Sequence, residues 1–345
     1  MSRIQYWNNP SAAQCGDSVE AFLHALGQPT CILIDGVDNS RTRALVTLIH
    51  GNEPSGVMAL HRWLREGRQP AVKTVCLVVS VQAALRAPLF SHRVLPGLRD
   101  LNRCFRAPFD DSQGELAADI LEVLREFRPE AIIDLHNTSG SGPSFGVATF
   151  VDQKHEALVS LFSRCLITND LRMGALMEIA ENLFPTVTIE CGGRLDAAAH
   201  SVAADGLRRF FETPELFPEK PQSWGIEVLR NPLRLELVEN CRLAYADTPQ
   251  AGYDLTLKTD IDQYNFGALE AGIQLGWVGE RALDIFIAKD PADAKTLRTL
   301  VTAADGALLT ARAVKLFMIT TNPVIAKMDC VCYALGNDSR GVMTL

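Results

Sequence analysis

Short apolar segments alternate with amphipathic segments between residues 43 and 190, and this alternation restricts the possible folds more than any other feature of the sequence. The apolar segments have the length of buried strands, whereas the amphipathic segments repeat with helical spacing. Strands that alternate with helices usually form a sheet whose faces the helices cover. We therefore expect an α/β domain in this part of the chain.

The expected strands cover residues 43–49, 74–81, 131–136, 147–151 and 186–190, and helices are expected over 55–66, 115–127 and 155–165. Gly67 ends the first helix and Pro129 stops the second. Polar side chains occur at three strand ends, as His50, His136 and Glu190. Active sites of open α/β sheets lie at the carboxyl ends of the strands, so we expect functional residues there.

The sequence changes in character after Pro214, where two further prolines follow at positions 218 and 221. Beyond them, short segments alternate between apolar and polar residues, which is typical of strands exposed on one face. We expect a catalytic domain over residues 1–214 and a smaller, mainly β domain over residues 215–345.

The charge balance disfavours two classes of partner. The 345 residues include 33 Lys and Arg against 41 Asp and Glu, a net charge of −8. Without a basic cluster, binding to nucleic acid or to an anionic membrane is not expected. The first ten residues lack the apolar segment of a secretory signal, no apolar stretch reaches the roughly 20 residues of a membrane span, and we expect a cytoplasmic protein. A homo-oligomer is compatible with this composition.

A metal site is indicated by His50 and Glu53, which are three residues apart at the end of a strand and the start of a helix. Zinc in hydrolases is commonly held by two histidines and a glutamate, with a fourth position for water. His136 could supply the second imidazole, because it also ends a buried strand. Taken alone, the first pair is better explained by a helix-capping glutamate beside a surface histidine.

Glu190 ends an apolar strand and precedes two glycines. A carboxylate in that place can act as a general base toward water activated by a metal, although a lone glutamate there is ordinarily a solvated strand end. The segment Asp100–Arg103 offers a guanidinium beside a carboxamide, and such a pair suits a substrate carboxylate. The alternative for Arg103 is an ordinary surface arginine in a loop.

Together these segments resemble the succinylglutamate desuccinylase/aspartoacylase family, relatives of the zinc carboxypeptidases. Four motifs carry the resemblance in the family's order: His50–Glu53, Asp100–Arg103, Asp134–His136 and Glu190–Gly192. The motifs fall within residues 43–193. The resemblance implies a zinc-carboxypeptidase-like mixed sheet flanked by helices, and a mainly β C-terminal domain that shapes the pocket entrance.

The resemblance also implies roles for individual residues. One zinc ion per chain would be bound by His50, Glu53 and His136, and Glu190 would be the catalytic base. Asn102 and Arg103 would bind the amino-acid carboxylate, and Asp100 would orient His50. The family further uses an arginine to polarise the scissile carbonyl, which we assign to Arg93 with Arg99 as the alternative; the family's C-terminal tyrosine could be Tyr264 or Tyr333.

These observations favour a zinc-dependent amidohydrolase that removes a small acyl group, succinyl or acetyl, from the amino nitrogen of an amino acid. Its partner would be a small N-acyl amino acid. Two alternatives remain open at this point: a metallocarboxypeptidase acting on peptides or cell-wall fragments, and a non-enzymatic binding protein on the same fold.

Overall fold

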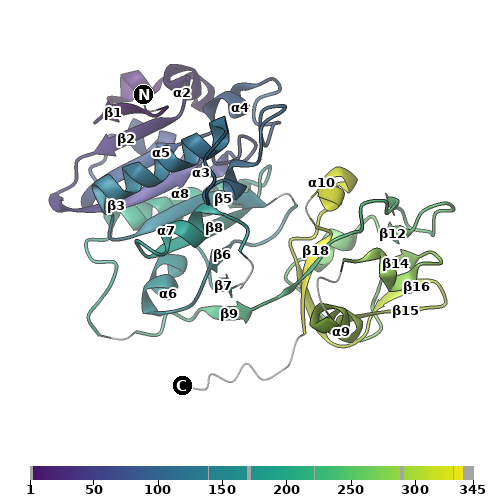
Figure 1. Ribbon diagram of the computed structural model, residues 1–345. Coiled ribbons are helices and arrows are strands. Elements are labelled where there is room, and N and C mark those ends of the chain that lie inside the picture. Colours follow the sequence, from purple (N-terminus) through teal and green to yellow (C-terminus); the bar gives the residue numbers. More distant parts are fainter. Residues whose placement is uncertain are drawn as a thin grey trace. The chain divides into compact units, whose positions relative to one another are not determined.

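The computed structural model describes residues 3–138, 140–168, 172–220, 222–287, 291–328 and 330–336. Its described residues form two compact units (Figure 1). The first unit comprises the described parts of 1–138 and 144–230, and the second comprises those of 139–143 and 231–345. Each unit has a hydrophobic core of its own.

A nine-stranded mixed sheet forms the centre of the first unit, with the strand order β1-β2-β4-β3-β5-β8-β6-β7-β9. Its middle strands, β4, β3, β5 and β8, run parallel to one another, whereas β2 and β6 join them in antiparallel fashion. The strands are β1 (Gln5–Asn8), β2 (Thr30–Ile34), β3 (Asp38–Thr47), β4 (Val72–Val78), β5 (Ile132–Thr138), β6 (Phe145–Ala148), β7 (Cys165–Thr168), β8 (Thr186–Gly193) and β9 (Glu227–Arg230).

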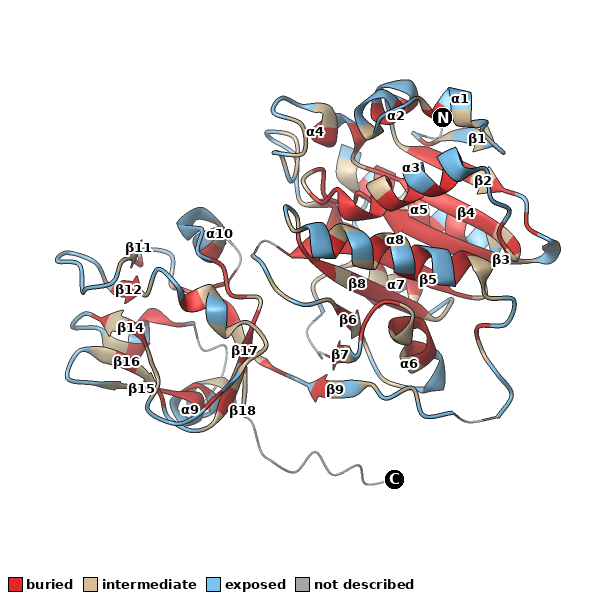
Figure 2. Ribbon diagram, turned by 180° about the vertical axis from the view of Figure 1, so that it is seen from behind, coloured by how far each residue is buried: buried red, intermediate tan, exposed pale blue. Residues whose placement is uncertain are grey.

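Helices cover both faces of this sheet. Neighbouring residues of β3 point to opposite faces: Leu45 shares one core with Leu60 and Leu207, whereas Val46 shares the other core with Ile120. The central strands are accordingly buried along most of their length (Figure 2). The helices of this unit are α1 (Ala12–Cys15), α2 (Val19–Leu26), α3 (Ser55–Glu66), α4 (Val81–Leu85), η1 (Leu101–Arg103), α5 (Ser112–Phe127), α6 (Gln153–Ser160), α7 (Leu176–Ala180) and α8 (Ala197–Glu212).

The second unit is rich in strands. A four-stranded sheet has the order β10-β18-β17-β13 and a five-stranded sheet has the order β11-β12-β14-β16-β15. The strands are β10 (Leu233–Leu235), β11 (Leu243–Tyr245), β12 (Leu255–Leu257), β13 (Ala268–Leu269), β14 (Gln274–Val278), β15 (Val301–Ala304), β16 (Ala307–Thr310), β17 (Val314–Phe317) and β18 (Cys332–Gly336). The helices are η2 (Ile261–Tyr264), η3 (Ala282–Ile285), α9 (Pro291–Leu300) and α10 (Pro323–Met328).

The expected fold class, an α/β sheet flanked by helices with a smaller β-rich C-terminal region, is confirmed. The two units divide the chain differently from the expected boundary after residue 214, because β9 follows the prolines and still pairs with β7. Residues near 141 belong to the second unit, where the Asn265 side chain donates a hydrogen bond to the Ser141 carbonyl. Across the described ranges, every helix is too short or too polar to cross a membrane.

Candidate active site

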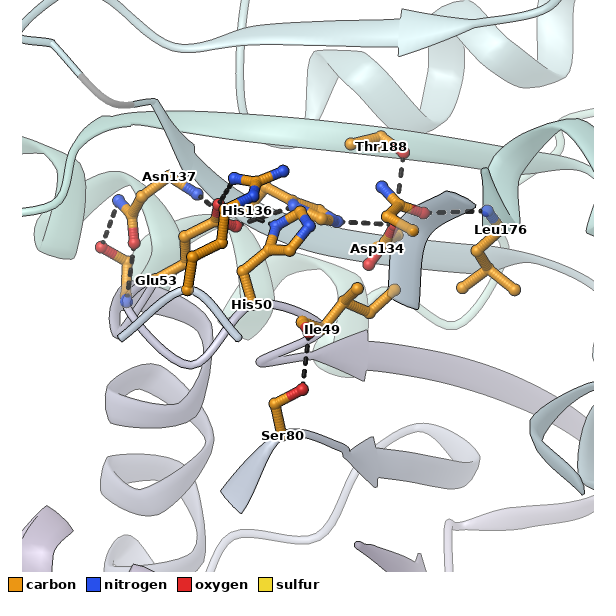
Figure 3. Close-up of polar contacts among 12 residues, drawn as sticks. Ile49, His50, Glu53, Ser80, Asp134, His136, Asn137, Leu176 and Thr188 are labelled. Atoms are coloured by element: carbon orange, nitrogen blue, oxygen red, sulfur yellow. Dashed lines mark hydrogen bonds and ion pairs between the residues drawn. The ribbon is translucent and has the colours of Figure 1, made fainter. Parts of the chain in front are cut away.

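A sharp turn after β3 brings His50 and Glu53 to the start of α3. The Glu53 amide donates to the His50 carbonyl across this turn, at 3.2 Å. Gly51 is required within it, since a Cβ atom there would lie 2.6 Å from Ala83. Both side chains are consequently turned to the same side of the turn and are buried (Figure 3).

His136 and Glu190 come from neighbouring strands. His136 lies near the end of β5 and is in register with Glu190 of the parallel strand β8. Parallel neighbours end at the same edge of a sheet, so an imidazole and a carboxylate from distant parts of the chain lie side by side. This is also the edge at which β3 delivers His50 and Glu53, because β3 is the other neighbour of β5.

Glu53 lies between the two imidazoles. One carboxylate oxygen is 2.8 Å from Nδ1 of His50 and the other is 2.8 Å from Nδ1 of His136. The three potential ligand atoms lie within 4.8 Å of one another, and all three residues are buried. His50 Nδ1 makes no well-directed hydrogen bond with any residue that the structure describes, despite its burial. Two imidazole nitrogens, a carboxylate and a buried unsatisfied lone pair fit a metal ion of the zinc type.

An aspartate lies against the Nε2 atom of each histidine, on the side of the ring away from Glu53. Nε2 of His50 is 2.9 Å from Oδ1 of Asp100, and Nε2 of His136 is 2.8 Å from Oδ2 of Asp134. A carboxylate accepts the proton of Nε2 and so leaves the lone pair of Nδ1 free to bind a metal. Asp100 was expected in this role. Asp134 was not, although its position two residues before His136 on one strand is a readable signal.

The charges in this cluster interact strongly. Burial opposes the ionisation of Glu53, yet the imidazoles of His50 and His136 hold the pKa of its carboxyl well below the ordinary value. Burial likewise opposes a positive His136, but Asp134 and Glu53 raise the pKa of that imidazole well above 6.5. Without a metal the His136 imidazole therefore favours a proton, which a bound cation would displace.

Glu190 is in a different electrostatic state. Burial raises the pKa of its carboxyl to about 7, although the His136 imidazole acts in the opposite direction. Its Oε2 atom is buried and has no hydrogen-bond partner within the described part of the chain. A carboxylate of this kind can accept a proton and return it near neutral pH.

Of the two candidate arginines, the structure brings Arg93 to the cluster. Its Nη1 donates to Glu53 Oε1 at 3.1 Å, and its Nη2 donates to Asp100 Oδ2 at 3.0 Å. Arg99 instead donates to Asp111 at 2.9 Å, through its own Nη2. Arg93 is partly exposed, with a side chain that retains 42% of its accessible surface, so its guanidinium lies between the buried ligands and solvent.

Asn102 and Arg103 follow Asp100 in η1. Asp100 caps this turn by accepting the Asn102 amide at 2.9 Å with the same oxygen that faces His50. The position of η1 is thereby linked to that of the histidine. The side-chain oxygen of Asn102 accepts the Leu176 amide at 3.0 Å, and Arg103 Nη1 donates to the Asn102 carbonyl at 2.9 Å.

One contributor to the site was not expected. The Asn137 carboxamide accepts the Ser55 amide at 3.0 Å, and donates to Ser55 Oγ at 2.8 Å and to the Gly192 carbonyl at 2.9 Å. It connects the three segments that carry Glu53, His136 and Glu190. No sequence signal reveals this link, because it exists only once the three segments have met.

The suggested tyrosines belong to the second unit: Tyr264 lies in η2 and Tyr333 lies in β18. The ring of Tyr333 is stacked on Phe317, with ring centres 5.8 Å apart. The family resemblance implies that one of these two residues is the family's C-terminal tyrosine, and this role stays a prediction.

The model of the succinylglutamate desuccinylase/aspartoacylase catalytic domain matches residues 39–208. Residues 39–208 are thus a catalytic domain of the succinylglutamate desuccinylase/aspartoacylase family. The family resemblance expected from the four motifs is confirmed. The matched residues include every residue of the metal cluster, together with Glu190, Arg93 and η1.

Solved structures with the same fold include a succinylglutamate desuccinylase/aspartoacylase from Rhodobacter sphaeroides. It is 15% identical with a TM-score of 0.55, and the match covers 83% of this chain and 82% of that one. The ectoine utilization protein EutE (DoeB) from Ruegeria pomeroyi is 16% identical with a TM-score of 0.53, over 83% and 82% of the chains. A succinylglutamate desuccinylase from Vibrio parahaemolyticus is 17% identical with a TM-score of 0.52, over 85% and 81%. A comparison with the curated proteins found no match.

The succinylglutamate desuccinylase/aspartoacylase family consists of hydrolytic deacylases that act on small N-acyl amino acids. Membership gives the chain an enzymatic fold, and the buried His50, Glu53 and His136 group is a candidate metal site within it.

Proposed function

We propose that this protein is a zinc-dependent amidohydrolase that removes a succinyl or acetyl group from the amino nitrogen of an amino acid. The observation that carries the proposal is the buried group of His50, Glu53 and His136, in which the Nδ1 atoms of both histidines face one carboxylate. Zinc fits this donor set, and each chain would hold one ion.

The substrate carboxylate would be bound by Asn102 and Arg103. Arg103 offers a planar guanidinium that suits a carboxylate, and Asn102 adds an amide donor from the preceding position. Because Asp100 holds both η1 and His50, the bound carboxylate would keep a fixed distance from the metal ligands. Holding the substrate in a fixed position relative to the catalytic groups contributes much of the rate acceleration of an enzyme.

Glu190 would move the proton. When bound, the zinc ion supplies a Lewis acid that lowers the pKa of water and polarises a carbonyl group. Oε2 of Glu190 would accept a proton from the attacking water and return it to the departing amide nitrogen. A pKa of about 7, which burial produces, lets one carboxylate serve in both steps at neutral pH.

Arg93 would act on the scissile carbonyl. Its guanidinium already lies against Glu53 and Asp100, at the exposed side of the cluster. A fixed positive charge there stabilises the negative charge that develops on the carbonyl oxygen as water attacks. The cytoplasmic location, the absence of a nucleic-acid or membrane partner and a homo-oligomeric state stay predictions.

The test combines metal analysis and hydrolysis on one purified sample. We expect one equivalent of zinc per chain, and turnover of N-succinylglutamate or N-acetylaspartate that is lost after chelation and restored by zinc. A short peptide with a free carboxyl end is included in the panel. Zinc with cleavage of that peptide alone would replace the proposal with the carboxypeptidase alternative, and failure to bind metal would leave the binding-protein alternative.

A further inference from the structure

The segment from Met173 to Leu176 lies along the residues that follow Asp100. The Phe105 amide donates to the Gly174 carbonyl at 3.0 Å, and the Leu176 amide donates to Asn102 Oδ1 at 3.0 Å. Gly174 has a φ of +79°, and a Cβ atom there would lie 2.9 Å from the Arg103 carbonyl oxygen. Only a glycine lets the two segments approach this closely without strain.

Glu178 holds this segment from the other side. It lies in α7, is only 7% exposed, and accepts the Met173 amide at 2.8 Å and the Gly174 amide at 2.9 Å. Its two carboxylate oxygens each take one of these amides. Nη2 of Arg106 lies 4.0 Å from one of these oxygens. A buried carboxylate with two amide bonds fixes the backbone that it binds, since leaving either group unpaired would be costly.

This arrangement determines which way the Asn102 side chain faces. The carboxamide has one oxygen that accepts and one nitrogen that donates. With the oxygen bound to Leu176, the two donor hydrogens of Nδ2 are turned away from α7, and they make no hydrogen bond to any described residue. The donors of Asn102 are therefore left for a ligand, and donors are what a substrate carboxylate requires.

We propose that Glu178 is a positioning residue for substrate binding, acting through the Met173–Leu176 segment on Asn102. The inference rests on the proposed function, because it takes the substrate to be a carboxylate bound by Asn102. Glu178 touches no reacting group, so its contribution is to substrate affinity rather than to the chemical step. A defect in this support should change KM far more than kcat.

The first experiment measures KM and kcat of zinc-loaded Glu178→Gln on the best substrate of the wild-type protein. Glutamine keeps one acceptor and puts a donor against an amide donor, so we expect KM to rise about tenfold and kcat to stay within about twofold. Gly174→Ala displaces the same segment by another route and should give the same pattern. It serves as the second variant should Glu178→Gln fail to fold.

The matched control is Glu181→Gln, three residues further along the chain. Glu181 accepts hydrogen bonds from His155 and from the Thr186 amide, and neither of these bonds involves η1. We expect this variant to lose stability while KM remains within about twofold of wild type. A rise in KM equal to that of Glu178→Gln would mean that the effect is a general loss of stability and would overturn the inference.

A double variant decides whether the effect passes through Asn102. In an Asn102→Ala background, Glu178→Gln should raise KM by less than about twofold, because the group that it positions is gone. An undiminished rise in that background would overturn the inference, as would an unchanged KM in both Glu178→Gln and Gly174→Ala. Inactivity of the wild-type protein on the whole substrate panel would instead overturn the proposed function, and this inference with it.

Discussion

Glu190 is the residue on which the proposed chemistry depends most. Its carboxyl has a pKa raised to about 7 and a buried oxygen free of partners among the described residues. Glu190→Gln keeps the shape and removes the base, so we expect kcat/KM to fall by about two to four orders of magnitude. The measurement is steady-state hydrolysis of the N-acyl amino acid that the wild type cleaves.

Two checks accompany that measurement. Zinc content and the unfolding temperature of Glu190→Gln should match wild type, which separates a lost base from a lost site. Glu126→Gln removes one carboxylate from the exposed face of α5, and its activity should stay within about twofold of wild type. Hydrolysis that survives Glu190→Gln would show that another group accepts the proton.

Asp134 is expected to control metal affinity. It is fully buried, and one of its oxygens accepts both from His136 at 2.8 Å and from the Thr188 hydroxyl at 3.4 Å. Removing an aspartate behind a histidine ligand typically weakens metal binding 10- to 100-fold. We expect that loss in Asp134→Asn, as measured by zinc competition with a chelator. Thr188→Val, which removes only the long hydrogen bond, should bind zinc within about threefold of wild type.

At the scale of single residues, the sequence identified the members of the candidate metal site better than the residues that hydrogen-bond to them. His50 and Glu53 could be found because three residues separate them at a strand end, and His136 because a buried strand delivers it. Asn137 could not be found, since its three hydrogen bonds join segments that are remote in sequence. Glu178 was equally hidden, as a carboxylate on a short helix ordinarily faces solvent.

At the scale of elements, periodicity located β3, β4, β5, β6 and β8 and their helices to within a few residues. Some boundaries differ from those expected. The helix expected over 155–165 ends at Ser160, and the strand β7 begins at Cys165. The order of the strands could not be read. β6 lies between β8, to which it is antiparallel, and β7, to which it is parallel, and this placement depends on non-local contacts that no local propensity records.

His155 joins three of these elements and makes their stability depend on pH. Its Nδ1 lies 2.7 Å from Asp152 at the start of α6, and its Nε2 lies 3.0 Å from Glu181 at the end of α7. Glu181 also accepts the Thr186 amide at the start of β8. Burial opposes a charge on this imidazole, but the two carboxylates outweigh it and raise the pKa of His155 above 6.5.

Because the pKa of His155 is higher in the folded state, its ion pairs stabilise the fold fully at a pH below the pKa of the unfolded chain, near 6.5. This stabilisation is lost as the pH rises through the pKa of the folded state. We expect His155→Gln to cost about 2 kcal/mol of unfolding free energy at pH 6, and less at each higher pH. Chemical denaturation of both proteins between pH 6 and pH 9 measures this difference. His24→Gln, at an exposed position on α2, should show no such trend; a constant deficit for His155→Gln would contradict the ion pairs.

At the scale of the whole molecule, the boundary between the two units follows their hydrophobic cores and does not follow the change in sequence composition. The prolines after residue 213 predicted a boundary there, yet β9 lies beyond them and adds Leu229, which is 6% exposed, to the first unit. Proline clusters mark irregular backbone, but whether a strand returns to the sheet after them depends on the free edge of β7, a feature that only the folded sheet possesses.

This division predicts the outcome of truncation. A chain ending at Arg230 keeps β9 and should unfold cooperatively and bind zinc, since the first core and all proposed metal ligands are present. A chain ending at Pro214 loses β9 and the burial of Leu229, and should be less stable by about 2 kcal/mol. Thermal unfolding of the two fragments compares them; equal stability would show that β9 contributes nothing to the first unit.

The Asn137 carboxamide has a consequence for the order of events when the protein is made. His50 and Glu53 meet His136 only after β5 has taken its place beside β3, and the carboxamide ties them to Gly192 only after β8 has joined. Until the middle of the sheet is assembled, a nascent chain cannot offer a metal ion all three residues of the candidate site together. A metal ion bound at this site would then stabilise the assembled fold by mass action and would not nucleate folding.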